Sequence, residues 1–274
     1  MSEHEAVLGR IATALERLAP PRTAAADWLS APAYVWDRQP RAVAQISAPS
    51  LGLLKGIEPQ KASVTANVAR LAAGYAAHDM LLWGARGMGK SALLRAAVVA
   101  AQVPDAGLMA LVQVAPDALA GLSGLFAALG QIDRRFIVFI DDLGFADDDS
   151  SGPRALRSWL EGGVEARPGN VRLAVTSNRR AIVPRHLSEQ DDPINPRDAV
   201  DDKLALADRF GLSLGFHACS QDDYLAMVEG YCAAHGLSWD RDAALEWAKR
   251  RGARSGRVAW QFVTECAGAA GIPL

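Results

Sequence analysis

The chain has 274 residues, of which 50% are hydrophobic and 22% are charged, enough for one large α/β domain and a small one. Its formal net charge of −2 excludes a bulk electrostatic attraction to nucleic acid or to an anionic membrane, so any such contact must come from a local basic patch. The three cysteines are far apart with no C-x-x-C pair, which is typical of small core residues in a reducing compartment.

The first fifty residues are predicted to form an N-terminal extension. They begin with MSEHEAVLGR, which has acidic residues where a signal peptide needs a basic region, and no apolar run in the chain approaches membrane-spanning length. We therefore expect a cytoplasmic protein with no membrane contact. A helical pattern over residues 5–18 stops at Pro20 and Pro21, and the segment 22–50 is less regular.

Residues 51–218 are predicted to form an α/β core. Buried strands are expected at 80–83, 108–114, 136–140, 171–176 and 212–218, and helices at 58–75, from Lys90, at 116–129, at 153–166 and before 211. Continuous apolar runs that alternate with helical patterns indicate a parallel sheet with both faces covered. The fold class is therefore α/β, with a five-stranded parallel sheet flanked by helices.

The remaining residues, 219–274, are predicted to form an all-helical lid. From Gln221 onward the apolar spacing is purely helical, over 224–235, 240–251 and 255–270. We place the boundary between core and lid near residues 218–221.

The motif that carries chemistry is G-x-x-x-x-G-K-S, written here as Gly84, Ala85, Arg86, Gly87, Met88, Gly89, Lys90 and Ser91. An apolar run enters it and a helical pattern leaves it, which is the context that a phosphate-binding loop requires. Its glycines let backbone N–H groups approach an anion closely, and the helix dipole adds to the attraction. We expect Lys90 to reach the β- and γ-phosphates of a nucleoside triphosphate and the Ser91 hydroxyl to bind Mg²⁺.

Two other interpretations of this loop are weaker. The pattern Gly87-x-Gly89-x-x-Ala92 also fits a loose dinucleotide fingerprint, but Lys90 and Ser91 have no purpose in a dinucleotide site. A glycine-rich turn that binds nothing is the other alternative.

Polar residues follow two of the expected strands. Asp141 and Asp142 end the third, and we expect Asp141 to serve the Mg²⁺ shell and Asp142 to polarise the attacking water. Asn178 follows the fourth and is placed to orient the same water. The alternatives are an acidic surface loop for the two carboxylates and a turn cap for the amide.

Together these residues resemble the AAA+ ATPases from about residue 51 to the C-terminus. The loop resembles the Walker A motif, residues 136–142 the Walker B motif, Asn178 the sensor 1 residue, Arg209 the arginine finger offered to a neighbouring subunit, and Arg254 the sensor 2 arginine, with Arg257 as a second candidate. We also count Ile57 among the nucleotide-binding residues. More narrowly, LLWGARGMGKS, LEGGVEARPGNV, TSNRR, DAVDDKLALADRFGL and GARSGRVAWQF resemble a bacterial AAA+ family known only as a domain of unknown function.

The resemblance implies a homo-oligomer, as a ring or an ATP-dependent assembly, that hydrolyses Mg²⁺-bound ATP at subunit junctions and remodels or loads an unidentified protein or nucleic-acid partner. Asp142 stands where many members have Glu, which keeps open an ATP-gated assembly module with little hydrolysis. Arg179, Arg180 and the basic run 249–257 keep open a nucleic-acid-associated helper ATPase. Residues 115–119 lack the pore loop of threading unfoldases, which disfavours that activity.

Overall fold

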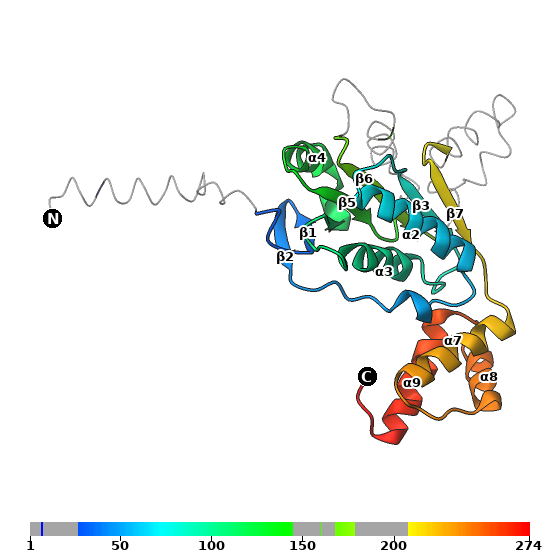
Figure 1. Cartoon of the computed structure of the whole chain (residues 1–274). Helices are drawn as coiled ribbons and strands as arrows, with labels where there is room; N and C mark the ends of the chain where they lie inside the picture. Colours follow the sequence, from blue (N-terminus) through cyan, green and yellow to red (C-terminus); the bar gives the residue numbers. More distant parts are fainter. Residues whose placement is uncertain (1–6, 8–26, 145–159, 161–167, 179–207) are drawn as a thin grey trace, which may run out of the picture. The chain divides into compact units, whose positions relative to one another are not determined.

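The computed structural model describes residues 7, 27–144, 160, 168–178 and 208–274 (Figure 1). The chain divides into two units, residues 1–30 and 31–274. In the described part of the first unit, the Asp27 carboxylate accepts a hydrogen bond of 2.9 Å from the backbone N–H of Leu29. The helices predicted at 5–18 and 153–166 lie almost wholly outside the described residues. All elements below belong to the second unit.

The second unit is built on a sheet whose strands are ordered β2-β1-β4-β5-β6-β3-β7. The strands are β1 (Ala33–Asp37), β2 (Gln39–Val43), β3 (Met80–Gly84), β4 (Met109–Val114), β5 (Arg135–Ile140), β6 (Val171–Ser177) and β7 (Leu212–Phe216). All neighbours pair in parallel except β1 and β2, which form an antiparallel hairpin. The predicted α/β fold is confirmed, and strands β3 to β7 are the five that the apolar runs indicate.

The sheet nevertheless has seven described strands where five were predicted. The two additional strands come from the segment that was expected to be less regular. Strand β2 is an edge strand whose side chains are largely exposed, and it carries Pro40, which only an edge position tolerates. Arg38 joins β1 to β2 with a φ of 56°. Strand β2 lacks an apolar run, whereas β1 has a short one, Ala33 to Trp36.

Helices cover both faces of the sheet (Figure 1). Helices α2 (Glu58–Ala72) and α3 (Lys90–Gln102) pack against each other and share one apolar core with Met80, Ile137 and Phe139 of the strands. Helix α4 (Leu122–Gly130), preceded by the 3-10 helix η2 (Pro116–Gly121), contacts β6 and buries leucines that lie outside that core. The buried face of α2 includes Val64, Val68, Leu71 and Ala72.

The three predicted C-terminal helices are present as α7 (Gln221–Ala234), α8 (Arg241–Arg250) and α9 (Gly256–Ala270). Each begins at a side-chain cap, which is Ser220, Asp240 or Ser255. Helix α7 packs on α9 and also contacts the 3-10 helix η1 (Leu51–Leu53) of the core. Tyr224 is fully buried and donates a hydrogen bond of 3.1 Å to the Ala244 carbonyl. The domain limits 1–50, 51–218 and 219–274 stay a prediction.

Candidate nucleotide-binding site

The predicted phosphate loop connects β3 to α3 in a conformation that requires glycine. Gly84 has a φ of 121°, and a Cβ on it would lie 2.1 Å from the Phe216 carbonyl oxygen of β7. A Cβ on Gly87 would lie 2.9 Å from the Ser255 hydroxyl and 3.1 Å from Cβ of Arg257. The loop is therefore held between β7 and the start of α9, and the Arg257 backbone N–H donates to the Gly87 carbonyl at 3.2 Å.

Lys90 lies inside this loop with 7% of its surface exposed. Its ammonium donates hydrogen bonds of 2.8 Å to the carbonyls of Gly84 and Ala85, and one of 3.3 Å to the Asn178 side-chain oxygen. Burial lowers the pKa of Lys90, and the Asp142 and Asp141 carboxylates oppose that shift. Over the described part of the chain, the hydrogen-bond partners of this buried ammonium are neutral, and it is poised to exchange them for the oxygens of an anion.

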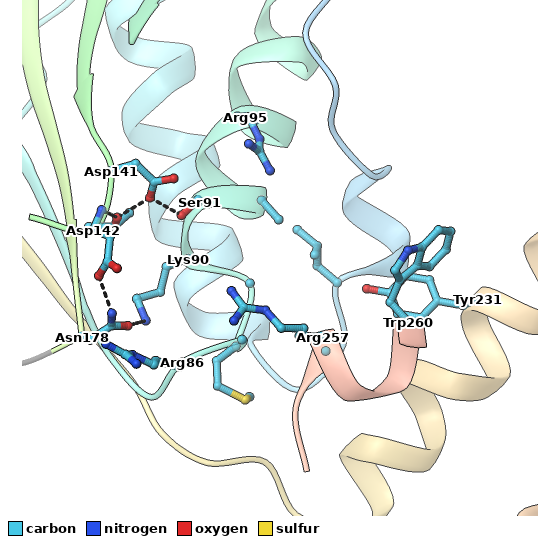
Figure 2. Close-up of a pocket in the computed structure, with 17 residues that line it drawn as sticks. Arg86, Lys90, Ser91, Arg95, Asp141, Asp142, Asn178, Tyr231, Arg257 and Trp260 are labelled. Atoms are coloured by element: carbon cyan, nitrogen blue, oxygen red, sulfur yellow. Dashed lines mark hydrogen bonds between the residues drawn. The ribbon is translucent and has the colours of Figure 1, made fainter. Parts of the chain in front are cut away.

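The end of β5 carries two carboxylates with different partners (Figure 2). Asp141 accepts hydrogen bonds from the Ser91 hydroxyl at 2.5 Å and from the Thr176 hydroxyl at 2.6 Å. The Thr176 hydroxyl in turn accepts one of 2.7 Å from the Asp142 backbone N–H. The Asp142 side chain accepts from the Asn178 amide. One connected network thus joins Lys90 to Asp142 through Asn178, and Asp142 to Ser91 through Thr176 and Asp141.

Two features of this network bear on its chemistry. The hydroxyl of Ser91 and the carboxylate of Asp141 are hard oxygen donors side by side, which is the kind of donor pair that Mg²⁺ takes next to phosphate oxygens. Asp142 has a φ of 52°, a left-handed conformation that is uncommon for a residue with a side chain and that is found at functional sites.

These groups line a pocket of about 620 Å³, which is within the range of small-molecule sites. Leu54, Ala92, Tyr231, Gly256 and Trp260 complete its wall. Four cations, Arg86, Lys90, Arg95 and Arg257, face two carboxylates, and the difference is two positive charges. An Mg²⁺-bound nucleoside triphosphate carries about two negative charges, so the pocket is complementary to it in charge.

Several lining residues have no counterpart among the predicted ones. Thr176 stands out only as a polar residue at the end of an apolar strand. Arg95 follows Ser91 by four residues on α3, a spacing that places both on one helix face, and its buried Nε has no hydrogen-bond partner among the residues that the structure describes. Tyr231 and Trp260 meet edge to face at 5.3 Å, and because they come from α7 and α9, no local sequence signal brings them together.

Five predicted residues do not line this pocket: Gly84 and Ala85 at the start of the loop, Ile57, Arg254 and Arg209. Ile57 is buried beside Gly89, while Leu54, its neighbour there, lines the pocket. Among the described residues, Arg254 lines a second pocket, whereas Gly256 and Arg257 line the first. Arg209 lies three residues before β7. The start of β7 is at the end of the sheet opposite to the phosphate loop, because Leu212 pairs with Met80 and Phe216 with Gly84.

The sheet, the loop at its carboxyl edge and the C-terminal helices have the fold of the AAA+ P-loop ATPases, as three solved structures show. The RuvB Holliday junction branch migration motor of Thermotoga maritima is 18% identical over 83% of this chain and 68% of its own, with a TM-score of 0.53. The Aeropyrum pernix Orc1 protein, solved in complex with DNA, is 17% identical over 77% and 61%, with a TM-score of 0.51. Domain III of the Thermotoga maritima replication initiation protein DnaA is 10% identical over 84% and 89%, at 0.50.

Residues 29–270 match the family described as "Protein of unknown function (DUF815)", and the chain belongs to this family. A comparison with curated proteins gives no match. Over the described residues, no helix has both the length and the apolar character needed to cross a membrane.

Proposed function

We propose that this protein is an AAA+ ATPase that binds Mg²⁺-ATP in the first pocket, hydrolyses it at a subunit junction and uses the turnover to remodel or load a partner. The observation that carries the proposal is the hydrogen-bonded network that connects Lys90, Asn178 and Asp142 to Asp141 and Ser91 within one pocket. A phosphoryl-transfer site needs such positioned charges more than it needs covalent chemistry.

The residues have separate roles in this proposal. The N–H groups of the loop and the ammonium of Lys90 bind the β- and γ-phosphates, while Ser91 and Asp141 hold Mg²⁺, which when bound neutralises phosphate oxygens. Asp142 accepts a proton from the attacking water, and Asn178, which already donates to Asp142, orients that water.

We assign the lid cation of the pocket to Arg257 in preference to Arg254. Arg257 lines the pocket and its backbone contacts the phosphate loop, whereas Arg254 lines the second pocket. Arg86 and Arg95 add two further cations beside the phosphates. The lid thereby senses the triphosphate through Arg257, and ADP, with one phosphate fewer, holds it less firmly.

The decisive experiment is calorimetric titration of Mg²⁺-ATP into wild type and Lys90→Ala. Loss of a charge-assisted contact should weaken binding by about tenfold or more. Because Lys90 also holds two loop carbonyls, thermal unfolding and circular dichroism must establish that the variant is folded. Arg250→Ala, which changes an exposed arginine that lines neither this pocket nor the second one, is the matched control and should bind like wild type. Equal affinity in Lys90→Ala and wild type would reject the site.

A second candidate function is an ATP-gated assembly module with little hydrolysis. Asp142 favours it, since its side chain is one methylene shorter than the Glu of many AAA+ members and is already bonded to Asn178. Single-turnover hydrolysis far slower than ATP-induced assembly would select this module. The partner of either form is a protein or a nucleic acid; the similar Orc1 protein was solved with DNA, and the similar RuvB protein is a Holliday junction branch migration motor.

A further inference from the structure

A second pocket, of about 790 Å³, lies beside the phosphate loop and is lined by loop residues Ala85 and Arg86, by the start of α7 and by the α8–α9 connection. Three of its lining residues are cations: Arg86, Lys249 and Arg254. Within the described part of the chain, no carboxylate lines it. The pocket is therefore a concentration of positive charge in a chain whose net charge is negative.

The basic run 249–257 divides into residues with structural partners and residues without them. Arg250 forms an ion pair of 3.3 Å with Glu246, and the Arg251 guanidinium lies 4.7 Å from the Trp247 ring centre. Lys249 and Arg254 line the pocket instead, and neither has a described ion pair. If the basic run were only a solvated helix face, there would be no reason for Lys249 and Arg254 to line the same cavity as Arg86.

A neighbouring carboxylate is engaged elsewhere. Burial raises the pKa of the Cys219 thiol, and the nearby Asp223 carboxylate raises it further, which places Asp223 close to the pocket. The Asp223 carboxylate accepts hydrogen bonds from the backbone N–H of Ser220 at 3.2 Å and from the Ser220 hydroxyl at 2.8 Å, in the capping box of α7. It therefore serves the helix end. The cations of the pocket are left to neutralise a ligand.

The rest of the wall indicates more than a bare anion. Part of the wall is apolar and is formed by Leu245 and Ala248 of α8 and by Ala218, which lies just before α7. Gln221 adds one side-chain amide to the wall. A volume of this size exceeds what one phosphate group fills, and pockets with an apolar wall and a few converging polar groups typically bind small molecules. A flat apolar body joined to a phosphate, as in a nucleotide unit, matches both halves.

We propose that this second pocket binds a nucleotide unit through its phosphate, with the base against the apolar wall, either as a free mononucleotide or as one residue of a single-stranded nucleic acid. The assignment is independent of hydrolysis in the first pocket. Arg86 lines both pockets, so a variant of it would disturb both sites. Lys249 and Arg254 line the second pocket only and are the residues to change.

The test uses the full chain without added ADP or ATP, first as wild type and then in the Lys90→Ala background, in which the phosphate loop is impaired. Calorimetry measures binding of a short oligothymidylate without terminal phosphates, at several salt concentrations, and in parallel binding of thymidine 5′-monophosphate. Lys249→Ala and Arg254→Ala should each weaken binding by about tenfold to a hundredfold. For the strand, each lost contact should reduce the slope of log K against log salt by about 0.7.

Arg250→Ala is the matched control, because it removes a charge from the same run but outside the pocket, and it should retain nearly all the affinity. Binding of the strand with this pattern supports a nucleic-acid source, and binding of the mononucleotide supports a free ligand. No binding of either probe, or equal losses in all three variants, would overturn the pocket. Persistence of binding in Lys90→Ala separates this result from any failure of the proposed ATP site.

Discussion

At the level of single residues, the site depends on Thr176 as much as on the motif residues. Its hydroxyl donates to Asp141 and accepts from the Asp142 backbone, so it orients the carboxylate next to Ser91 and holds the turn that carries Asp142. With 1% of its surface exposed, Thr176 has no water to replace either bond. A buried hydroxyl that links two functional carboxylates is a positioning residue.

Thr176→Val should therefore destabilise the fold by about 1–3 kcal/mol, since it leaves the Asp142 N–H without its acceptor. It should also raise the Mg²⁺ concentration needed for half-maximal ATPase activity, because Asp141 loses one of its two donors. Denaturant unfolding and Mg²⁺ titration measure the two effects. Thr176→Ser keeps the hydroxyl and should restore both; a Ser variant as impaired as the Val variant would point to packing alone.

Asp142 carries the second residue-scale prediction. Asp142→Asn should bind Mg²⁺-ATP with nearly unchanged affinity but release phosphate at least about a hundredfold more slowly, because the amide cannot take the proton of the attacking water. Asp142→Glu keeps a carboxylate and should retain turnover. Phosphate release and calorimetry on the three proteins check this, and wild-type turnover in Asp142→Asn would mean that another group is the base.

The site residues that could be predicted are those whose pattern lies within a short stretch of sequence. The loop and the pair Asp141 and Asp142 lie at strand ends, and each is apparent from a few consecutive residues. Arg95 could have been found from its helical spacing to Ser91. Which of Arg254 and Arg257 faces the pocket depends on where the turn before α9 ends, and Ser255 caps that helix between them. The sequence does not show where that turn ends, so it cannot decide between the two arginines.

At the level of elements, β3 and β7 are joined so closely at the phosphate loop that Gly84 cannot be replaced. The Ala85 N–H donates to the Phe216 carbonyl at 2.7 Å, over the position where a Cβ of residue 84 would stand. The apolar runs predicted both strands but not this approach. Strand β2 was not predicted because its contact with water leaves few apolar residues in it, and β1 was not predicted because its short apolar run lies in a segment that contains Pro32 and Pro40.

Two glycine variants test this picture. Gly84→Ala should cost more than about 4 kcal/mol or prevent folding, since its Cβ would overlap the Phe216 carbonyl at a φ of 121°. Gly124→Ala is the contrast: it lies in α4 with no atom within 4 Å of the added Cβ, and it should stabilise the fold by about 0.5–1 kcal/mol. Thermal unfolding of the two variants measures the predicted loss of stability in Gly84→Ala and the predicted gain in Gly124→Ala. A Gly84→Ala protein as stable as wild type would contradict so close an approach of β3 and β7.

At the level of the whole molecule, the first pocket is large enough for a nucleotide and is lined by four cations. Arg209 is not one of these four. A strand rises about 3.3 Å per residue, so roughly 13 Å separates Leu212, at the start of β7, from Phe216, which pairs with Gly84 of the phosphate loop. Arg209 precedes Leu212 and lies at the far end. An arginine at that end cannot reach a triphosphate in its own subunit. It can reach one in a neighbour if copies of the chain assemble head to tail.

The complementation of two inactive variants tests that arrangement. Arg209→Ala should bind Mg²⁺-ATP normally yet hydrolyse it several orders of magnitude more slowly, because a trans arginine stabilises the charge of the transition state. Lys90→Ala cannot use its own site but still offers Arg209, so mixing the two variants should restore part of the turnover. Specific activity of the wild type should also rise with protein concentration as subunits assemble. If activity is independent of concentration and the mixture shows no rescue, Arg209 is a structural arginine whose role ends within its own subunit.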